Sequence, residues 1–385
     1  MLHSLLRVLM QHTEVSIAHV IGENEQDIRF RAASGMAERR TRDRNEKERE
    51  DKGPHRGNSV QHGSCHTRHA YCAQSIKRQL PTGFSLPVPG RCAVLWKRFN
   101  RSLQTMSANP IDAQFDLRAR HPNFQDYFDR NETLSQNALE SLPSRLDVRY
   151  GPHPLQTVDF FPAPEPGGPI VIFIHGGYWR ALDKKGYRFI AKALHRAGCA
   201  VSLFNYRLAP DVSLADIVAD IRNALSLAIR TASDINGDPR KMHLTGHSAG
   251  GHLALMAALE LQRSTSALLN SIRSVFSLSG LFDLSPIRQS FLNAALQLSE
   301  PDARAFSPLR QPIPILPFPL HFAVGSSETN AFIEQSKSMR ERAQGQGNES
   351  AFELAQGLNH FEIVYDFGLE GGLLNKKLLK VVSGS

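Results

Sequence analysis

The sequence has few features of a membrane-embedded or disulfide-stabilised protein. No run of 18 apolar residues occurs in its 385 positions, which excludes a helix that crosses a bilayer by itself. Only four residues are cysteine, too few for a disulfide framework in a chain of this size, so the composition favours a reducing compartment. We therefore expect a cytoplasmic protein without a membrane partner.

Most of the chain, residues 106–385, has a formal net charge of zero. Residues 1–105 contain 18 Lys and Arg against 10 Asp and Glu, whereas residues 106–385 contain 27 of each. The formal charge of +8 thus belongs to the first segment, and it does not indicate a nucleic-acid partner for the rest of the chain. The mixed-charge run Glu38–Lys52 has no apolar face that could offset its ordering entropy. We predict that residues 1–105 are disordered or a mis-extension upstream of a start at Met106, and that residues 106–385 form the functional domain.

One cluster in the first segment contains residue types that bind metals: His62, Cys65, His66, His69 and Cys72. Its spacing fits no known zinc pattern, and no second pair of ligands follows it. We interpret the cluster as an accident of composition and predict neither a metal nor an organic cofactor.

The pattern of residues 106–385 favours an α/β fold. Apolar, strand-like segments alternate with amphipathic helical ones, as in a mostly parallel central sheet with helices on both faces. The run PIVIFI at 169–174 is typical of a buried parallel strand. Further strands are expected at 146–150, 156–161, 199–205, 241–245, 274–279, 320–324 and 351–355. Helices are expected within 112–142 and at 184–196, 214–232, 249–261 and 332–343.

A G-x-S-x-G motif, residues 246–250, lies between a predicted strand and a predicted helix. This is the context of an exposed nucleophile on a sharp turn. Such a turn strains the backbone of the serine, and a Cβ on either flanking glycine would clash. We therefore predict that Ser248 is a nucleophile.

The loop His175-Gly176-Gly177 follows the PIVIFI strand. Glycines at this place allow backbone N–H groups to approach a negatively charged oxygen closely. Together with the N–H of Ala249, the amides of Gly176 and Gly177 are predicted to form an oxyanion hole.

A serine nucleophile needs a histidine base and an orienting acid, which follow it along the chain in this class. Only His252, His321 and His360 follow Ser248. His252 lies one turn into the next helix and His321 opens a strand, whereas His360 lies in a loop that could return to the nucleophile. His360 is therefore the predicted base.

Two carboxyl groups compete for the role of the acid. Glu328 follows the strand at 320–324, and Asp283 follows the preceding strand. A residue at the end of the later strand reaches His360 more naturally, so we prefer Glu328 and keep Asp283 as the alternative.

Six segments occur in order and carry a family resemblance: HGGYWRALDK, NYRLAP, GHSAGGHLA, SGLFDLSPI, SETNAF and GLNHF. Together they resemble the α/β-hydrolase fold with small cap elements, and within it the arylformamidase (kynurenine formamidase) group, which is related to the hormone-sensitive-lipase-like esterases. The resemblance covers about residues 110–370. It implies hydrolysis of N-formyl-L-kynurenine to formate and L-kynurenine in tryptophan breakdown, with the triad roles at Ser248, Glu328 and His360.

Three questions stay open at this level. A carboxylesterase for short acyl esters would use the same catalytic residues, and a non-catalytic hydrolase-fold module would not need them. Tyr178 and Trp179 are expected either to line the substrate pocket or to pack in the core. The expected partner is a small-molecule substrate, and a homodimer is compatible with the sequence.

Overall fold

The computed structural model describes residues 109–384, and these residues form an eight-stranded sheet. The strand order is β1-β2-β4-β3-β5-β6-β7-β8. β1 pairs antiparallel with β2, and β2 with β4, while the pairs from β4 to β8 are parallel. The mostly parallel α/β sheet expected from the sequence is confirmed. The expectations for residues 1–105 lie outside the described residues.

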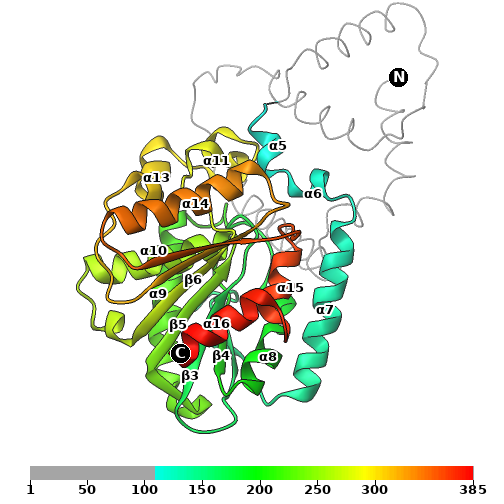
Figure 1. The fold of residues 1–385 in the computed structure, drawn as a ribbon, viewed down its shortest axis with the longest axis vertical. Helices are drawn as coiled ribbons and strands as arrows, with labels where there is room; N and C mark the ends of the chain where they lie inside the picture. Colours follow the sequence, from blue (N-terminus) through cyan, green and yellow to red (C-terminus); the bar gives the residue numbers. More distant parts are fainter. Residues whose placement is uncertain (1–108, 385) are drawn as a thin grey trace, which may run out of the picture. The chain divides into compact units, whose positions relative to one another are not determined.

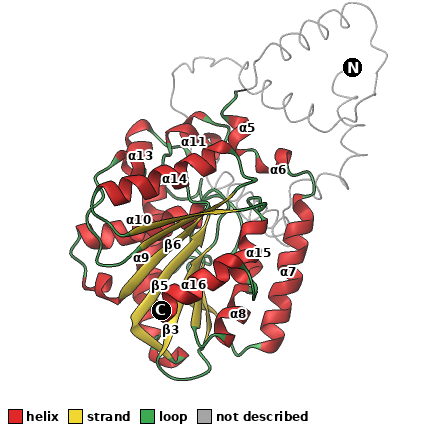
Figure 2. Ribbon diagram, viewed as in Figure 1, coloured by secondary structure: helices red, strands yellow, loops and turns green. Residues whose placement is uncertain are grey.

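The strands lie close to their predicted ranges, and Figure 2 shows them as a twisted sheet between helices. Their bounds are β1 (Arg145–Arg149), β2 (Thr157–Phe161), β3 (Gly168–Ile174), β4 (Ala200–Phe204), β5 (Gly237–His247), β6 (Ile272–Leu278), β7 (Leu320–Gly325) and β8 (Ser350–Ala355). β5 begins earlier than expected because Gly237 pairs with Gly168, ahead of the apolar part of the strand.

Both faces of the sheet are buried, which explains the unbroken apolar run of β3. Ile170, Ile172 and Ile174 belong to one core cluster, whereas Val171 and Phe173 belong to the other. This alternation follows from the period of two of a β-strand. A strand covered on both sides has no solvent-facing positions for polar residues.

Helices cover the two faces of the sheet (Figure 1). One face packs against α9 (Leu214–Thr231), α10 (Ala249–Arg263) and α14 (Asn330–Gly345), and the other against α8 (Ile190–Arg196), α15 (Glu362–Gly368) and α16 (Leu373–Ser383). None of the helices within 109–384 is long and apolar enough to cross a membrane.

The remaining helices precede the sheet or connect β6 to β7. α5 (Asp112–Phe115), α6 (Leu117–Arg120) and α7 (Phe124–Ser141) lead into the sheet, as expected for 112–142. The short helices between β6 and β7 are α11 (Ser285–Gln289), α12 (Asn293–Leu296) and α13 (Glu300–Ala305). The helix expected at 184–196 begins as a separate 3-10 turn, η1 (Lys184–Tyr187), and continues as α8. The sequence pattern did not predict α15 and α16.

Candidate active site

The predicted nucleophile lies on a strained turn between β5 and α10. Ser248 has φ 57° and ψ −120°, a backbone conformation that a residue with a side chain rarely adopts. A Cβ added to Gly246 would lie 2.3 Å from the carbonyl oxygen of Gly250, and one on Gly250 would lie 1.9 Å from that of Ile174. The expected clash is confirmed at both glycines, so the motif G-x-S-x-G is a steric requirement of this turn.

The HGG loop passes directly beside the serine. A Cβ on Gly176 would lie 3.1 Å from the Cβ of Ser248. Gly177 has φ +105°, and a Cβ there would lie 2.0 Å from the carbonyl oxygen of Ala181. The two glycines are thus needed both for the approach to Ser248 and for the fold of the loop. Ala249 follows the serine as the first residue of α10, so the three predicted oxyanion donors gather around one turn.

A tyrosine of the segment NYRLAP, to which the sequence analysis gave no role, holds this loop. The Tyr206 hydroxyl lies 3.0 Å from the carbonyl oxygen of His175 and 3.2 Å from that of Gly176, so its one proton makes a bifurcated hydrogen bond. Its ring stacks on the His175 ring at 4.4 Å between centroids. Both side chains are fully buried. With these carbonyl oxygens fixed, the peptide planes and their N–H groups have a set direction.

The predicted base and acid meet in a buried pair. Nδ1 of His360 lies 2.6 Å from Oε2 of Glu328, and the two side chains come from the loops after β8 and β7. The loops are themselves joined, because Ser327 N–H donates to the carbonyl oxygen of Leu358 at 3.0 Å. Because Nδ1 of His360 faces Glu328, Nε2 is the ring nitrogen that remains for proton exchange.

The other oxygen of the acid is held separately. Oε1 of Glu328 accepts a hydrogen bond from the Ser279 hydroxyl at 2.6 Å and one from Gly325 N–H at 2.8 Å. Ser279 lies just beyond β6, and the sequence analysis missed it. It opens the segment SGLFDLSPI that carries the family resemblance, but nothing in that segment connects its hydroxyl with Glu328.

The alternative residues lie in other environments. Asp283 pairs with Arg310, whose Nη2 lies 2.6 Å from its Oδ2. His252 is fully buried and places Nε2 2.8 Å from the carbonyl oxygen of Phe306; burial lowers its pKa to about 4. His321 stacks on Phe276. The described structure places Glu328, and not these groups, on His360.

Aromatic rings surround the base. The centroids of Phe332 and His247 lie 4.4 and 4.5 Å from that of His360. His247 precedes the nucleophile, so this contact places His360 next to the serine turn. Burial, followed by the nearby charge of His360, lowers the pKa of His247 well below its usual value. A neutral His247 does not oppose a positive charge on the base.

The two aromatic residues after the HGG loop have different positions. Trp179 is fully buried and packs edge-on against His252 at 5.1 Å, which favours the core-packing alternative for this side chain. Tyr178 is partly buried, and its hydroxyl donates to the carbonyl oxygen of Phe115 in α5 at 2.9 Å. Burial raises its pKa, with a further contribution from Glu328. Tyr178 therefore joins the HGG loop to the leading helices.

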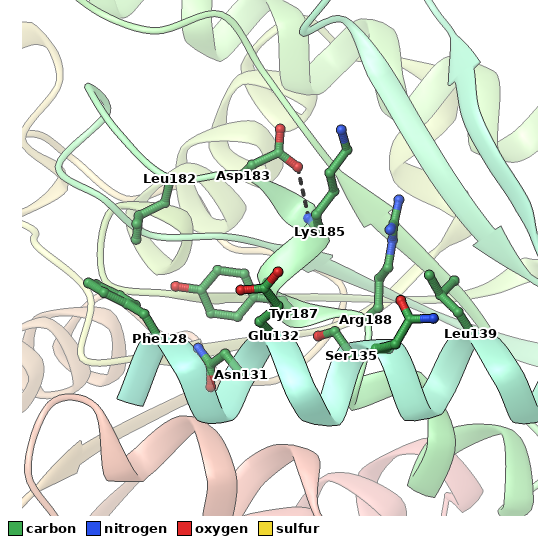
Figure 3. Close-up of a pocket in the computed structure, with 12 residues that line it drawn as sticks. Phe128, Asn131, Glu132, Ser135, Leu139, Leu182, Asp183, Lys185, Tyr187 and Arg188 are labelled. Atoms are coloured by element: carbon green, nitrogen blue, oxygen red, sulfur yellow. Dashed lines mark hydrogen bonds between the residues drawn. The ribbon is translucent and has the colours of Figure 1, made fainter. Parts of the chain in front are cut away.

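A separate pocket of about 370 Å³ lies between α7 and η1 (Figure 3). Its lining includes Phe128, Asn131 and Tyr187, and it contains none of the eight predicted site residues. Within 109–384, no group of three or more His, Cys, Asp and Glu side chains is arranged to hold a metal ion.

Comparisons with known proteins agree on the fold and on hydrolytic relatives. A family model described as BD-FAE matches residues 160–297. A kynurenine formamidase from Danio rerio is 30% identical over 257 residues, 65% of this chain and 86% of the relative. An isoprenylcysteine alpha-carbonyl methylesterase from Arabidopsis thaliana is 28% identical over 252 residues, 59% of each chain. A solved structure of a Silicibacter protein matches with a TM-score of 0.63 at 25% identity, covering 71% of this chain and 99% of its own.

Proposed function

This chain belongs to the kynurenine formamidase family of α/β-hydrolases, and we propose that it hydrolyses N-formyl-L-kynurenine to formate and L-kynurenine. The observation that carries the proposal is the buried contact of 2.6 Å between His360 and Glu328, next to the strained turn of Ser248. The relatives named above are hydrolases, so the chain is an enzyme of the serine hydrolase type and not a non-catalytic module.

The first half of the proposed reaction transfers the formyl group to the enzyme. Oγ of Ser248 attacks the formyl carbon while Nε2 of His360 takes its proton. Glu328 holds the imidazole in the required tautomer and stabilises its positive charge. The amides of Gly176, Gly177 and Ala249 donate to the oxyanion, a contribution of about 3 kcal/mol per donor in comparable sites.

The second half releases both products. The C–N bond breaks as His360 gives its proton to the departing arylamine, which leaves a formyl ester on Ser248. Water then attacks this ester, His360 accepts a proton from the water, and formate departs as the proton returns to Oγ. An aniline nitrogen is a better leaving group than an alkylamine nitrogen, so a site of the esterase type suffices for this bond. The residues present complete the cycle with water as the second substrate.

The aromatic surroundings of the base support an aryl substrate. Phe361, which follows the base, is partly buried and stacks on Tyr127 of α7 at 5.0 Å between ring centroids. The Tyr178 hydroxyl donates to the carbonyl oxygen of Phe115 in α5. Aromatic side chains bind a planar ring through large apolar faces and offset or edge-on contacts, which suits a kynurenine ring.

A carboxylesterase acting on short acyl esters is the second candidate, and the methylesterase from Arabidopsis thaliana favours it. The test compares kcat/KM for N-formyl-L-kynurenine and p-nitrophenyl acetate, with the full chain and with Ser248→Ala as the control. We expect the higher value for the formamide and a loss of about 10⁴-fold or more in the control for both substrates. Rapid ester turnover without formamide cleavage would assign the chain to the carboxylesterases instead.

The partner and the compartment follow from this proposal. A small-molecule substrate is the expected partner, with no nucleic acid, membrane or cofactor required. We place the activity in the cytoplasm, where free cysteines such as the buried Cys199 stay reduced. A homodimer is compatible with this function.

A further inference from the structure

We propose that Ser279 is a positioning residue for the catalytic acid, acting on Glu328 and through it on His360. This inference rests on the proposed triad but not on the identity of the substrate. Its basis is the contact of 2.6 Å between the Ser279 hydroxyl and Oε1 of Glu328, in a place where the residue is fully buried.

The two oxygens of the acid have separate tasks. Oε2 faces Nδ1 of His360 at 2.6 Å, while Oε1 accepts from Ser279 Oγ and from Gly325 N–H. A glutamate has one more rotatable bond than an aspartate, so its carboxylate has more ways to turn away from the base. Two donors on Oε1 remove that freedom and leave Oε2 directed at the imidazole.

The backbone around Ser279 is arranged for this contact. Ser279 has φ +50°, a conformation that costs free energy for a residue with a side chain. Its N–H donates to the carbonyl oxygen of Ala323 in β7 at 2.7 Å, so the pairing of neighbouring strands sets its position. A Cβ on Gly325 would lie 2.2 Å from the carbonyl oxygen of Leu358 and 3.2 Å from Oε1 of Glu328. The second donor to the acid therefore needs a glycine.

Ser277 shows what a serine without this role looks like. It belongs to β6, two residues before Ser279, and it is equally buried. Its hydroxyl has no hydrogen-bond partner among the described residues. Ser277→Ala removes the same atom from the same region without touching Glu328, and it is the matched control.

The test measures kcat and KM for p-nitrophenyl acetate in a double-mutant cycle of the full chain. We expect Ser279→Ala to lower kcat about 10-fold, the scale of one hydrogen bond to a charged group, with KM within about twofold, because the hydroxyl acts on the acid and not on substrate binding. In a Glu328→Gln background the same substitution should change kcat by less than about twofold. Ser277→Ala should leave both constants unchanged.

Each outcome decides the inference. An equal loss of kcat in both backgrounds, or a kcat for Ser279→Ala within about twofold of the parent, overturns it. If Ser279→Ala fails to fold, Ser279→Gly replaces it, since glycine accepts φ +50° and also lacks the hydroxyl. If the parent cleaves neither the ester nor the formamide, the cycle is run on the rate at which a fluorophosphonate labels Ser248. The positioning role is then supported if Ser279→Ala slows the labelling of Ser248 in the parent but does not change its rate in the Glu328→Gln background. This result holds even where the proposed substrate is wrong.

Discussion

Asp159 and Glu328 are both buried carboxylates in this protein, and their partners differ. Asp159 lies on β2 and is fully buried. Its oxygens lie 3.2 Å from Nζ of Lys184 and 2.7 Å from Nη2 of Arg188, and one also accepts from Asp147 N–H at 2.8 Å. Glu328 instead meets an imidazole, a hydroxyl and a backbone N–H.

The difference separates a structural carboxylate from a catalytic one. Lysine and arginine keep their charges at neutral pH, so the group around Asp159 holds β1, β2 and η1 in one fixed electrostatic arrangement. An imidazole gains and loses a proton near neutral pH, so the partner of Glu328 can change charge during a reaction. Burial alone therefore does not identify the functional acid; the chemistry of its partner does.

Among these predictions, Glu328→Gln should have the largest effect, because it removes the catalytic carboxylate and thereby lowers kcat. The amide keeps the shape of the side chain but does not stabilise a positive imidazole, and it permits the wrong tautomer. We expect kcat to fall about 10³- to 10⁴-fold, as for comparable triad acids, with KM little changed. The measurement is steady-state turnover of the better substrate.

Asp283→Asn is the matched control for this change, because Asp283 was the alternative acid. Its side chain pairs with Arg310, which is half-exposed, and such pairs contribute little. We expect its kcat within about twofold of the parent. A large loss for Asp283→Asn, together with a small one for Glu328→Gln, would reverse the assignment of the acid.

Asp159→Asn should have the opposite effect: a large loss of stability without a loss of catalysis. The change leaves the largely buried charge of Arg188 with less compensation, whereas Lys184, which is 1% exposed, keeps its shorter ion pair with Asp147 at 2.5 Å. Removing one partner of such a pair costs about 3 to 5 kcal/mol of unfolding free energy. Urea denaturation measures this cost. Turnover per folded enzyme, counted by fluorophosphonate labelling, should match the parent, and a drop in that value would mean that the Asp159 group also serves the reaction.

The sequence predicted those parts of the site that steric demands mark with glycine. Gly246 and Gly250 flank Ser248, and Gly176 and Gly177 form the adjacent loop, because a Cβ at each of these places meets backbone or the serine itself. The fold followed from β3 in the same way, since a strand buried on both faces is apolar throughout. His360 could be predicted as the base because few histidines follow the nucleophile in the sequence.

The roles of the residues that hold these groups could not be predicted, although Tyr206 and Ser279 lie in the segments NYRLAP and SGLFDLSPI that carry the family resemblance. Ser279 acts across 49 positions on Glu328, and Tyr206 acts across about 30 positions on the HGG loop. Asp159 meets Arg188 across 29 positions. Each is a common residue type within an ordinary strand or loop, and its partner is decided by strand pairing rather than by a local motif.

The smallest expected effect concerns His243, a buried titratable group whose ring makes its hydrogen bond, within the described residues, with a hydroxyl and not with a charged group. Its Nδ1 lies 2.8 Å from Oγ of Ser274, and burial, with smaller contributions from Arg273 and His321, lowers its pKa to about 4. The unfolded chain binds a proton below about pH 6.5, where an ordinary histidine titrates, while folded His243 stays neutral until about pH 4. Stability is therefore lost as the pH falls through this window, by about 1.4 kcal/mol per pH unit for this group.

His243→Gln should reduce this loss by the contribution of one histidine. Glutamine can keep a polar contact with Ser274 but takes up no proton, so the variant should lose about 1 kcal/mol less than the parent between pH 6 and pH 5. Urea denaturation at the two pH values measures the difference. Other buried histidines, such as His252, contribute to both proteins alike, so their effect cancels. Equal slopes would mean that His243 binds its proton in the folded state as readily as in the unfolded one, and that a hydroxyl partner suffices to hold a charge in this core.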